Sequence, residues 1–149
     1  MPTTNFDTLF PNDLTGVITK MEVKDLDDTK NRVLEIDRAW KVEVDWRIVG
    51  TNADTIAGIW NLSLRIESMG EGIEAEVAST TVNLASVQPA STPSLRLYHA
   101  EMTIPVGKID KVGIYKPVLL ITYLNENGSP RPMAGFAEFS LITFYKDQP

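Results

Sequence analysis

The clearest feature of the chain is a strict alternation of apolar and charged residues between Ala39 and Val49. The apolar positions are Trp40, Val42, Val44, Trp46 and Ile48, and the charged positions between them are Lys41, Glu43, Asp45 and Arg47. Successive side chains of a β-strand point to opposite faces, so this period of two predicts a strand with one buried and one solvated face. It indicates a sheet that covers a core on one side only.

The same alternation recurs along the chain and predicts most of the other strands. Residues 59–67 alternate cleanly, with Trp60, Leu62, Leu64 and Ile66 on the inner face. Residues 17–23 form a first strand, for which the period places Val17, Thr19, Met21 and Val23 inside. The remaining expected strands are 33–36, 73–77, 80–84, 96–104, 115–124 and 136–145, of which 33–36, 73–77 and 80–84 read as short or edge strands. No stretch has a convincing helical period.

The pattern as a whole predicts a fold of seven or eight short strands, separated by turn residues roughly every 8–12 positions. The length of 149 residues is that of one domain. We therefore expect an all-β sandwich over residues 15–146. Residues 1–14 lack a clean period and are expected to form an extended N-terminal arm with Phe6, Leu9 and Phe10 as apolar anchors.

The residues that lead into the penultimate expected strand resemble a feature of a known family. An aspartate, a small residue and a tyrosine, at Asp110, Gly113 and Tyr115, resemble the tyrosine corner of immunoglobulin-like domains. The pattern departs from antibody domains, since Asp110 lies one residue further from the tyrosine and Pro117 stands where a disulfide cysteine would be. The resemblance implies an immunoglobulin-like or fibronectin type III-like antiparallel β-sandwich, and it implies little about activity.

A second resemblance covers most of the chain. Three segments carry it, residues 6–10, 39–50 and 133–138. They resemble segments of small uncharacterised bacterial sandwich proteins that are associated with phage-tail-like contractile injection particles. This resemblance implies a structural or accessory role within a larger bacterial assembly.

Charge and composition narrow the expected partners. The formal net charge of −6 argues against broad binding of a nucleic-acid backbone, which needs clustered Lys and Arg. No apolar run approaches the length of a membrane span, and no signal peptide is visible at the start. The chain has no cysteine, which suits a reducing compartment. We expect a cytoplasmic protein that binds neither nucleic acid nor membrane.

The residues that carry common chemistry do not assemble into a motif. There is a single histidine, His99, and its position in the alternation places it on the outer face of a strand. No Gly-x-Ser-x-Gly turn and no Walker loop is present. Three aspartates among residues 25–28 lack the central Gly and the final Glu of an EF-hand loop. We expect no catalytic residue, no cofactor and no metal site, and therefore a non-enzymatic protein.

The three tryptophans allow an alternative reading. Exposed aromatic side chains would favour a sandwich that binds carbohydrate or another small molecule. Each tryptophan here shares a strand face with Val, Leu or Ile, which favours core packing instead.

The last two expected strands break the alternation, and this break suggests a surface for a partner. If Tyr115 points inward, Val118 and Leu120 point outward, and if Glu138 is outside, so are Ile142 and Phe144. The four apolar side chains would then form one patch on the outer sheet face, which monomers seldom leave bare. The candidate interface is therefore Val118, Leu120, Ile142 and Phe144, with Arg131 in the loop 125–132 as a second contact.

Two explanations of this patch remain open. The arm of residues 1–14 could fold over it, or the patch could meet another subunit or a protein partner, by face packing or through a shared sheet edge. Both hold if the arm is exchanged between subunits. The expected function is protein–protein interaction or a structural role, and the alternative is binding of a small molecule or carbohydrate.

Overall fold

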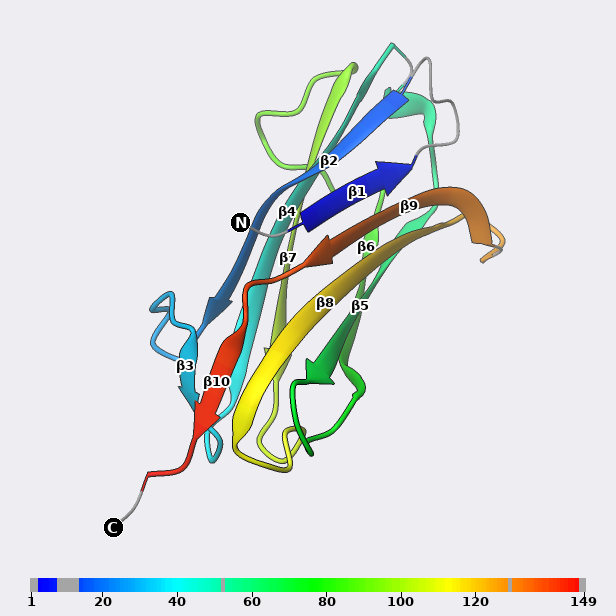
Figure 1. The fold of residues 1–149 in the computed structure, drawn as a ribbon. Coiled ribbons are helices and arrows are strands. Elements are labelled where there is room, and N and C mark those ends of the chain that lie inside the picture. Colours follow the sequence, from blue (N-terminus) through cyan, green and yellow to red (C-terminus); the bar gives the residue numbers. More distant parts are fainter. Residues whose placement is uncertain (1–2, 8–13, 52, 129, 148–149) are drawn as a thin grey trace.

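The structure, a computed structural model, describes residues 3–7, 14–51, 53–128 and 130–147, and the side chains of 3, 5, 7 and 130–132 are left aside. The described residues form ten strands and one short 3₁₀ helix (Figure 1). These are β1 (Thr3–Asp7), β2 (Leu14–Lys24), β3 (Val33–Glu35), β4 (Trp40–Gly50), η1 (Ala53–Thr55), β5 (Ile59–Ser68), β6 (Ala75–Asn83), β7 (Leu95–Ile104), β8 (Gly113–Leu124), β9 (Pro130–Glu138) and β10 (Ile142–Tyr145). None of the described segments is a helix that could span a bilayer.

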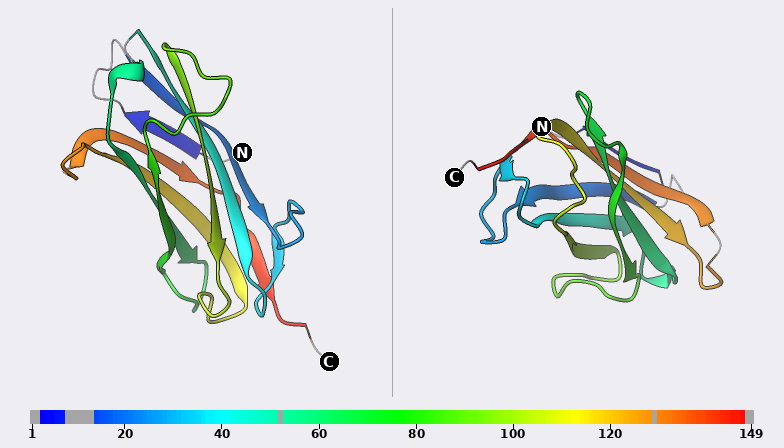
Figure 2. Two further views of the ribbon diagram at one scale, coloured as in Figure 1. Left: turned by 180° about the vertical axis from the view of Figure 1, so that it is seen from behind. Right: turned by 90° about the horizontal axis from the view of Figure 1, so that it is seen from below.

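The strands pack as two sheets, which appear as separate layers in Figure 2. The smaller sheet has the order β2-β4-β7. In the larger sheet β8 pairs with β5 on one side, and β5 pairs with β6. On its other side β8 pairs with β9 and β10, which lie end to end along it, while β1 pairs with β9 and β3 pairs in parallel with β10.

The predicted fold class, an all-β immunoglobulin-like antiparallel sandwich, is confirmed. The ten described strands exceed the expected seven or eight, and they differ from the expected ranges in three main places. The arm contributes β1, and the expected last strand is divided into β9 and β10. In the opposite sense, the two weak segments around residue 78 join into the single edge strand β6.

Aromatic side chains fill the space between the two sheets. All three tryptophans are buried, as the alternation predicts. Trp46 of β4 and Trp60 of β5 meet edge to face with ring centroids 6.2 Å apart, which joins the two layers. Edge-to-face geometry is the one that aromatic quadrupoles favour. The indoles therefore do not form an aromatic platform for a sugar.

The tyrosine corner expected from the sequence is present. Tyr115 is fully buried at the start of β8, and its hydroxyl donates a hydrogen bond to the backbone carbonyl of Lys111 at 2.6 Å. Burial raises the pKa of this phenol. Gly72 is needed beside it, because a Cβ there would lie 1.9 Å from the Tyr115 hydroxyl oxygen. The contact ties the loop before β8 to the loop after β5.

The inner face of β2 differs from the prediction. A β-bulge between Ile18 and Lys20 shifts the register against β4, so the inward parity changes within the strand. Leu14 and Ile18 are buried before the bulge, and Met21 and Val23 after it, while Thr19 is exposed. The uniform period of two therefore gave the wrong orientation for Val17 and Thr19.

Part of the expected arm is a strand of the larger sheet. Residues 3–7 form β1, which pairs antiparallel with β9 from Thr3–Glu138 to Asp7–Ala134. The Phe6 ring lies 5.8 Å from the ring of Trp60, edge to face. It also lies against Gly16 of β2 and Gly135 of β9, so it reaches between the sheets. The other two anchors, Leu9 and Phe10, lie outside the described residues.

Candidate functional site

The apolar patch expected on the outer face does not exist as predicted. Ile142 and Phe144 are only 1% and 2% exposed and belong to the core, where Phe144 meets both Trp40 and Tyr115 edge to face. Val118 is 9% exposed, whereas Leu120 is 40% exposed. Of the four residues, Leu120 alone presents a large open surface.

The error comes from a break in the last strand. Met133 and Ala137 point into the core from β9, whereas Ile142 and Phe144 do so from β10, so the inward positions change from odd to even. The change occurs across residues 139–141, which belong to neither strand. The amide of Phe139 still donates to the carbonyl of Pro117 at 2.9 Å, which holds the interruption beside β8.

The outer face of β8 and β9 keeps a smaller apolar area. Leu120 pairs in register with the half-buried Phe136 of β9, and Val118 lies beside them on the same face. Phe136 shares this face because it has the outward parity of β9. The predicted second contact, Arg131, has a side chain outside the described residues, so its role in an interface stays a prediction.

A different surface, the free edge of β6, combines length with an absence of charge. Among the described residues β6 pairs with β5 only. Val77 has no partner in the β5–β6 register and forms a bulge near the start of the strand. After it, residues 78–83 read Ala-Ser-Thr-Thr-Val-Asn, six residues without a charge or a proline. Ser79, Thr81 and Asn83 are exposed.

Other edges of the sandwich carry protection that residues 78–83 of β6 lack. Proteins usually guard exposed strand edges with charges, prolines, bulges or covering loops. The β2 edge has a bulge and three lysines, Lys20, Lys24 and, in the following loop, Lys30. At the β7 edge, the amide and carbonyl of Leu97 are bonded by Ser91 and Gln88 of the preceding loop. Residues 78–83 therefore form the candidate functional site, called the β6 edge below.

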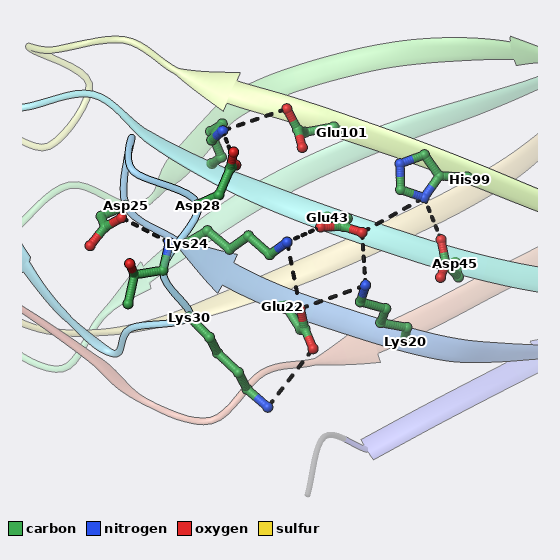
Figure 3. Close-up of polar contacts among 12 residues, drawn as sticks. Lys20, Glu22, Lys24, Asp25, Asp28, Lys30, Glu43, Asp45, His99 and Glu101 are labelled. Carbon is green, nitrogen blue, oxygen red and sulfur yellow. Dashed lines mark hydrogen bonds and ion pairs between the residues drawn. The ribbon is translucent and has the colours of Figure 1, made fainter.

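The outer face of the smaller sheet carries a dense set of ion pairs (Figure 3). Glu43 of β4 lies at its centre and accepts hydrogen bonds from Lys20, at 2.7 Å, and from Lys24. These two bonds hold the pKa of Glu43 at about 2, below its ordinary 4.5. Glu22 lies in the same row and is within 3.9 Å of Lys20, Lys24 and Lys30.

His99 occupies this face, as its outward parity predicts. Its Nδ1 lies 2.5 Å from an Asp45 carboxylate oxygen and 4.0 Å from a Glu43 carboxylate oxygen, as Figure 3 shows. One nitrogen and two carboxylates at this spacing could contact one metal ion. A cation would have to displace the lysines that already neutralise Glu43. The arrangement is therefore better suited to holding three strands together than to binding a metal.

Two of these features could be found in the sequence only in part. The weak alternation of residues 73–84 does predict an edge strand, and the run 77–83 is visibly uncharged. Its role as the edge of the larger sheet depends on which strands pair with β5, and no local pattern specifies that. The pairing of Leu120 with Phe136 likewise depends on the register across the 125–132 turn.

No protein-family model and no curated protein matches the chain. Among solved structures, a β-glucosidase from Erythrobacter marinus superposes with a TM-score of 0.53 and 11% identity, over 89% of this chain and 16% of the β-glucosidase. The C-terminal domain of Wzt superposes with a TM-score of 0.53 and 10% identity, over 90% of this chain and 74% of that domain. The CARDB domain of a Pyrococcus furiosus protein gives a TM-score of 0.46 at 16% identity, over 94% of this chain and all of that domain.

The first two likenesses show the fold alone, since their sequence identities are low. The chain spans only 16% of the length of the β-glucosidase. None of these structures supports the resemblance to proteins of contractile injection particles. What the comparisons and the fold establish together is an all-β sandwich domain.

Proposed function

We propose that this protein is a non-enzymatic interaction module that associates with a second copy of itself through the β6 edge. The observation that carries the proposal is the run of six uncharged residues on an unpaired edge. An open edge offers backbone amides and carbonyls that a further strand can bond. The setting that the sequence resemblance implies is a structural or accessory role within a larger bacterial assembly.

The chemistry of the β6 edge suits a second copy of the same strand. In an antiparallel pair about a two-fold axis, each strand meets its own sequence in reverse. Ser79, Thr81 and Asn83 would then face small hydroxyl or amide side chains, and such cross-strand pairs are favourable. The net charge of −6 opposes association in general, but residues 78–83 bring no like charges together.

The surroundings of the single histidine favour a non-enzymatic role. His99 lies half-exposed on an open sheet face, bonded to Asp45 among ion pairs, and not in a cleft that could hold a substrate. The alternative function is binding of a small molecule or carbohydrate, and an aromatic platform for carbohydrate would need exposed indoles, whereas all three are buried. These two observations favour association over catalysis at His99 and over carbohydrate binding on an aromatic platform.

The test is the solution mass of the protein by light scattering, as a function of concentration. We expect the natural chain to be a dimer or larger. The double variant Ser79→Lys/Thr81→Lys should be monomeric, because the added charges on exposed positions would repel across the pair. Both side chains are exposed, so the fold should persist in circular dichroism.

The matched control is Asn61→Lys/Ser63→Lys on β5. Asn61 pairs with Thr81, and Ser63 pairs with Ser79. This variant therefore places the same charges at the paired positions of β5, the strand next to the edge. It should associate like the natural chain. A natural chain that is monomeric at every concentration, or an edge variant that associates as well as the natural chain, would refute the proposal.

A further inference from the structure

A second feature, a cleft of about 220 Å³, lies on the opposite side of the sandwich from β6. It opens between β2 and the interruption that separates β9 from β10. Its apolar lining comes from Met21, Val23, Phe139 and Ile142, and its polar lining from Glu22, Lys30, Arg32 and Ser140. Met21, Val23 and Ile142 are buried core residues, so the floor of the cleft is the edge of the core itself.

The cleft exists because the last strand is broken. Residues 139–141 bridge from β9 to β10 without pairing as a strand, and β2 has no neighbour in its own sheet on this side. The two sheet edges are therefore not closed over the core between Met21 and Ile142. Met21 adds adaptability, since an unbranched thioether side chain can change its shape to fit a bound group.

Two cations stand at the rim of the cleft. Lys30 is mostly exposed, and its ion pair with Glu22 spans 3.9 Å. Glu22 is already within 3.9 Å of Lys20 and Lys24, so it does not depend on Lys30 for neutralisation. The exposed Arg32 side chain makes no ion pair or hydrogen bond with another described residue. The rim therefore offers two cations, Lys30 and Arg32, to an anionic group.

We propose that this cleft binds a small carboxylate with an apolar body. The body would lie against Met21, Phe139 and Ile142, and the carboxylate would reach the guanidinium of Arg32, whose planar fork matches a carboxylate in two hydrogen bonds. Lys30 would add a second charge. Small-molecule sites commonly combine an apolar lining with a few such polar groups. The inference does not rest on association through the β6 edge.

The test is titration of the full chain with hexanoate, followed by the backbone amide signals in NMR. We expect saturable shifts at residues 21–23, 30–32 and 139–142, with a dissociation constant on the order of 0.1–1 mM for so small a ligand. Hexan-1-ol has the same apolar body without the charge. It should bind about tenfold more weakly, because a charge-assisted hydrogen bond is lost.

Two variants probe the rim and the mouth of the cleft separately. Arg32→Ala should weaken hexanoate about tenfold without affecting hexan-1-ol. Arg65→Ala is the matched control, since it removes the same charge from the exposed outer face of β5 and should leave binding unchanged. Ser140→Phe should fill the mouth of the cleft and abolish binding of both compounds.

The outcomes are distinct. Equal shifts with hexanoate and hexan-1-ol, or equal hexanoate binding by the natural chain and Arg32→Ala, would overturn the assignment of a carboxylate. Shifts confined to other surfaces, or no shift at all, would overturn the site. If Ser140→Phe does not fold, the comparison of Arg32→Ala with Arg65→Ala still decides the matter.

Discussion

The ring of Phe6 occupies the space that a side chain on either of two glycines would need. A Cβ on Gly16 would lie 2.5 Å from one edge of the ring, and a Cβ on Gly135 would lie 2.5 Å from the other edge. Gly16 belongs to β2 and Gly135 to β9, so one aromatic side chain is fitted between the two sheets. The two glycines are required here for space rather than for backbone conformation.

This fit predicts the effect of adding one methyl group. Gly135→Ala should lower the free energy of unfolding by about 1–3 kcal/mol, because the ring must move away from its contact with Trp60. The measurement is urea denaturation followed by tryptophan fluorescence. Gly70→Ala is the control, since a Cβ at Gly70 meets no atom within 4 Å.

A double-mutant cycle isolates the contact. In a Phe6→Ala background the ring is absent, so Gly135→Ala should cost much less than it does in the natural chain. An equal cost in both backgrounds would mean that the alanine clashes with something other than Phe6.

The ion pairs of Glu43 predict how the free energy of unfolding depends on pH. Its folded-state pKa of about 2 lies below the ordinary 4.5, so its ion pairs contribute fully above about pH 4.5. That contribution is lost as the pH falls towards 2. Glu43→Gln should therefore destabilise the protein by about 1–2 kcal/mol at about pH 6 and by much less at about pH 2. Urea midpoints of both proteins across this pH range measure the difference.

Glu101→Gln provides the control for Glu43. Glu101 of β7 pairs in register with Glu43 of β4. Its side chain is 42% exposed, and its carboxylate reaches the Lys41 ammonium only at 3.9 Å. Removing this charge should change the urea midpoint little at either pH. If Glu43→Gln and Glu101→Gln behaved alike, the hydrogen bonds from Lys20 and Lys24 would not be the source of the effect.

At the scale of secondary structure, alternation predicts orientation well wherever a strand is unbroken. The inward residues of β4 and β5 follow the period of two throughout, and every one of them from Trp40 to Ile48 and from Trp60 to Ile66 is buried. Tyr115 is also correctly predicted, because its corner is a local contact with Lys111.

The period fails where a strand gains or loses one residue. The bulge at β2 and the bridge at 139–141 each change the parity of the residues that follow. For this reason the predicted outer set wrongly included Ile142 and Phe144. A bulge is decided by how two strands fit together, so the sequence of one strand seldom reveals it.

The positions of the two candidate sites depend even more than strand orientation does on which strands pair with one another. The uncharged run of β6 is visible in the sequence, but its position at the sheet edge follows from β5 pairing with β8. The cleft joins Met21 to Ile142, residues that are remote in the chain and meet only after both sheets have formed. Neither feature has a local motif that could have identified it.

At the scale of the whole molecule, the two sheet faces and the strand edges have different characters. The smaller sheet presents paired charges, the larger sheet presents Leu120 and Phe136, and the β6 edge presents hydroxyl and amide groups. β1 covers a further edge, that of β9 from Ala134 to Glu138. Among the described strands, the edge of β9 is thus covered by β1, whereas the β6 edge has no further strand beside it.

Removal of residues 1–7 should open the covered edge. We expect a loss of about 2–4 kcal/mol in the free energy of unfolding, because the Phe6 contact and the pairing with β9 both disappear. In the Ser79→Lys/Thr81→Lys background, where the β6 edge is blocked, the shortened chain should associate through β9. Light scattering compares its mass with that of the full-length double variant. A shortened chain with unchanged stability and mass would mean that β1 contributes little.

The pairing of β1 with β9 also sets an order of events during synthesis. β1 is translated long before β9, so on the ribosome it has no partner until most of the domain has emerged. Contacts between segments so distant in the chain require a large loop to close, and the entropy cost of that closure slows folding. During this interval Phe6 and the unfinished gap between Gly16 and Trp60 are both exposed to other chains in the cell. Nascent copies on one messenger are therefore the setting in which strands of neighbouring molecules could most readily be interchanged.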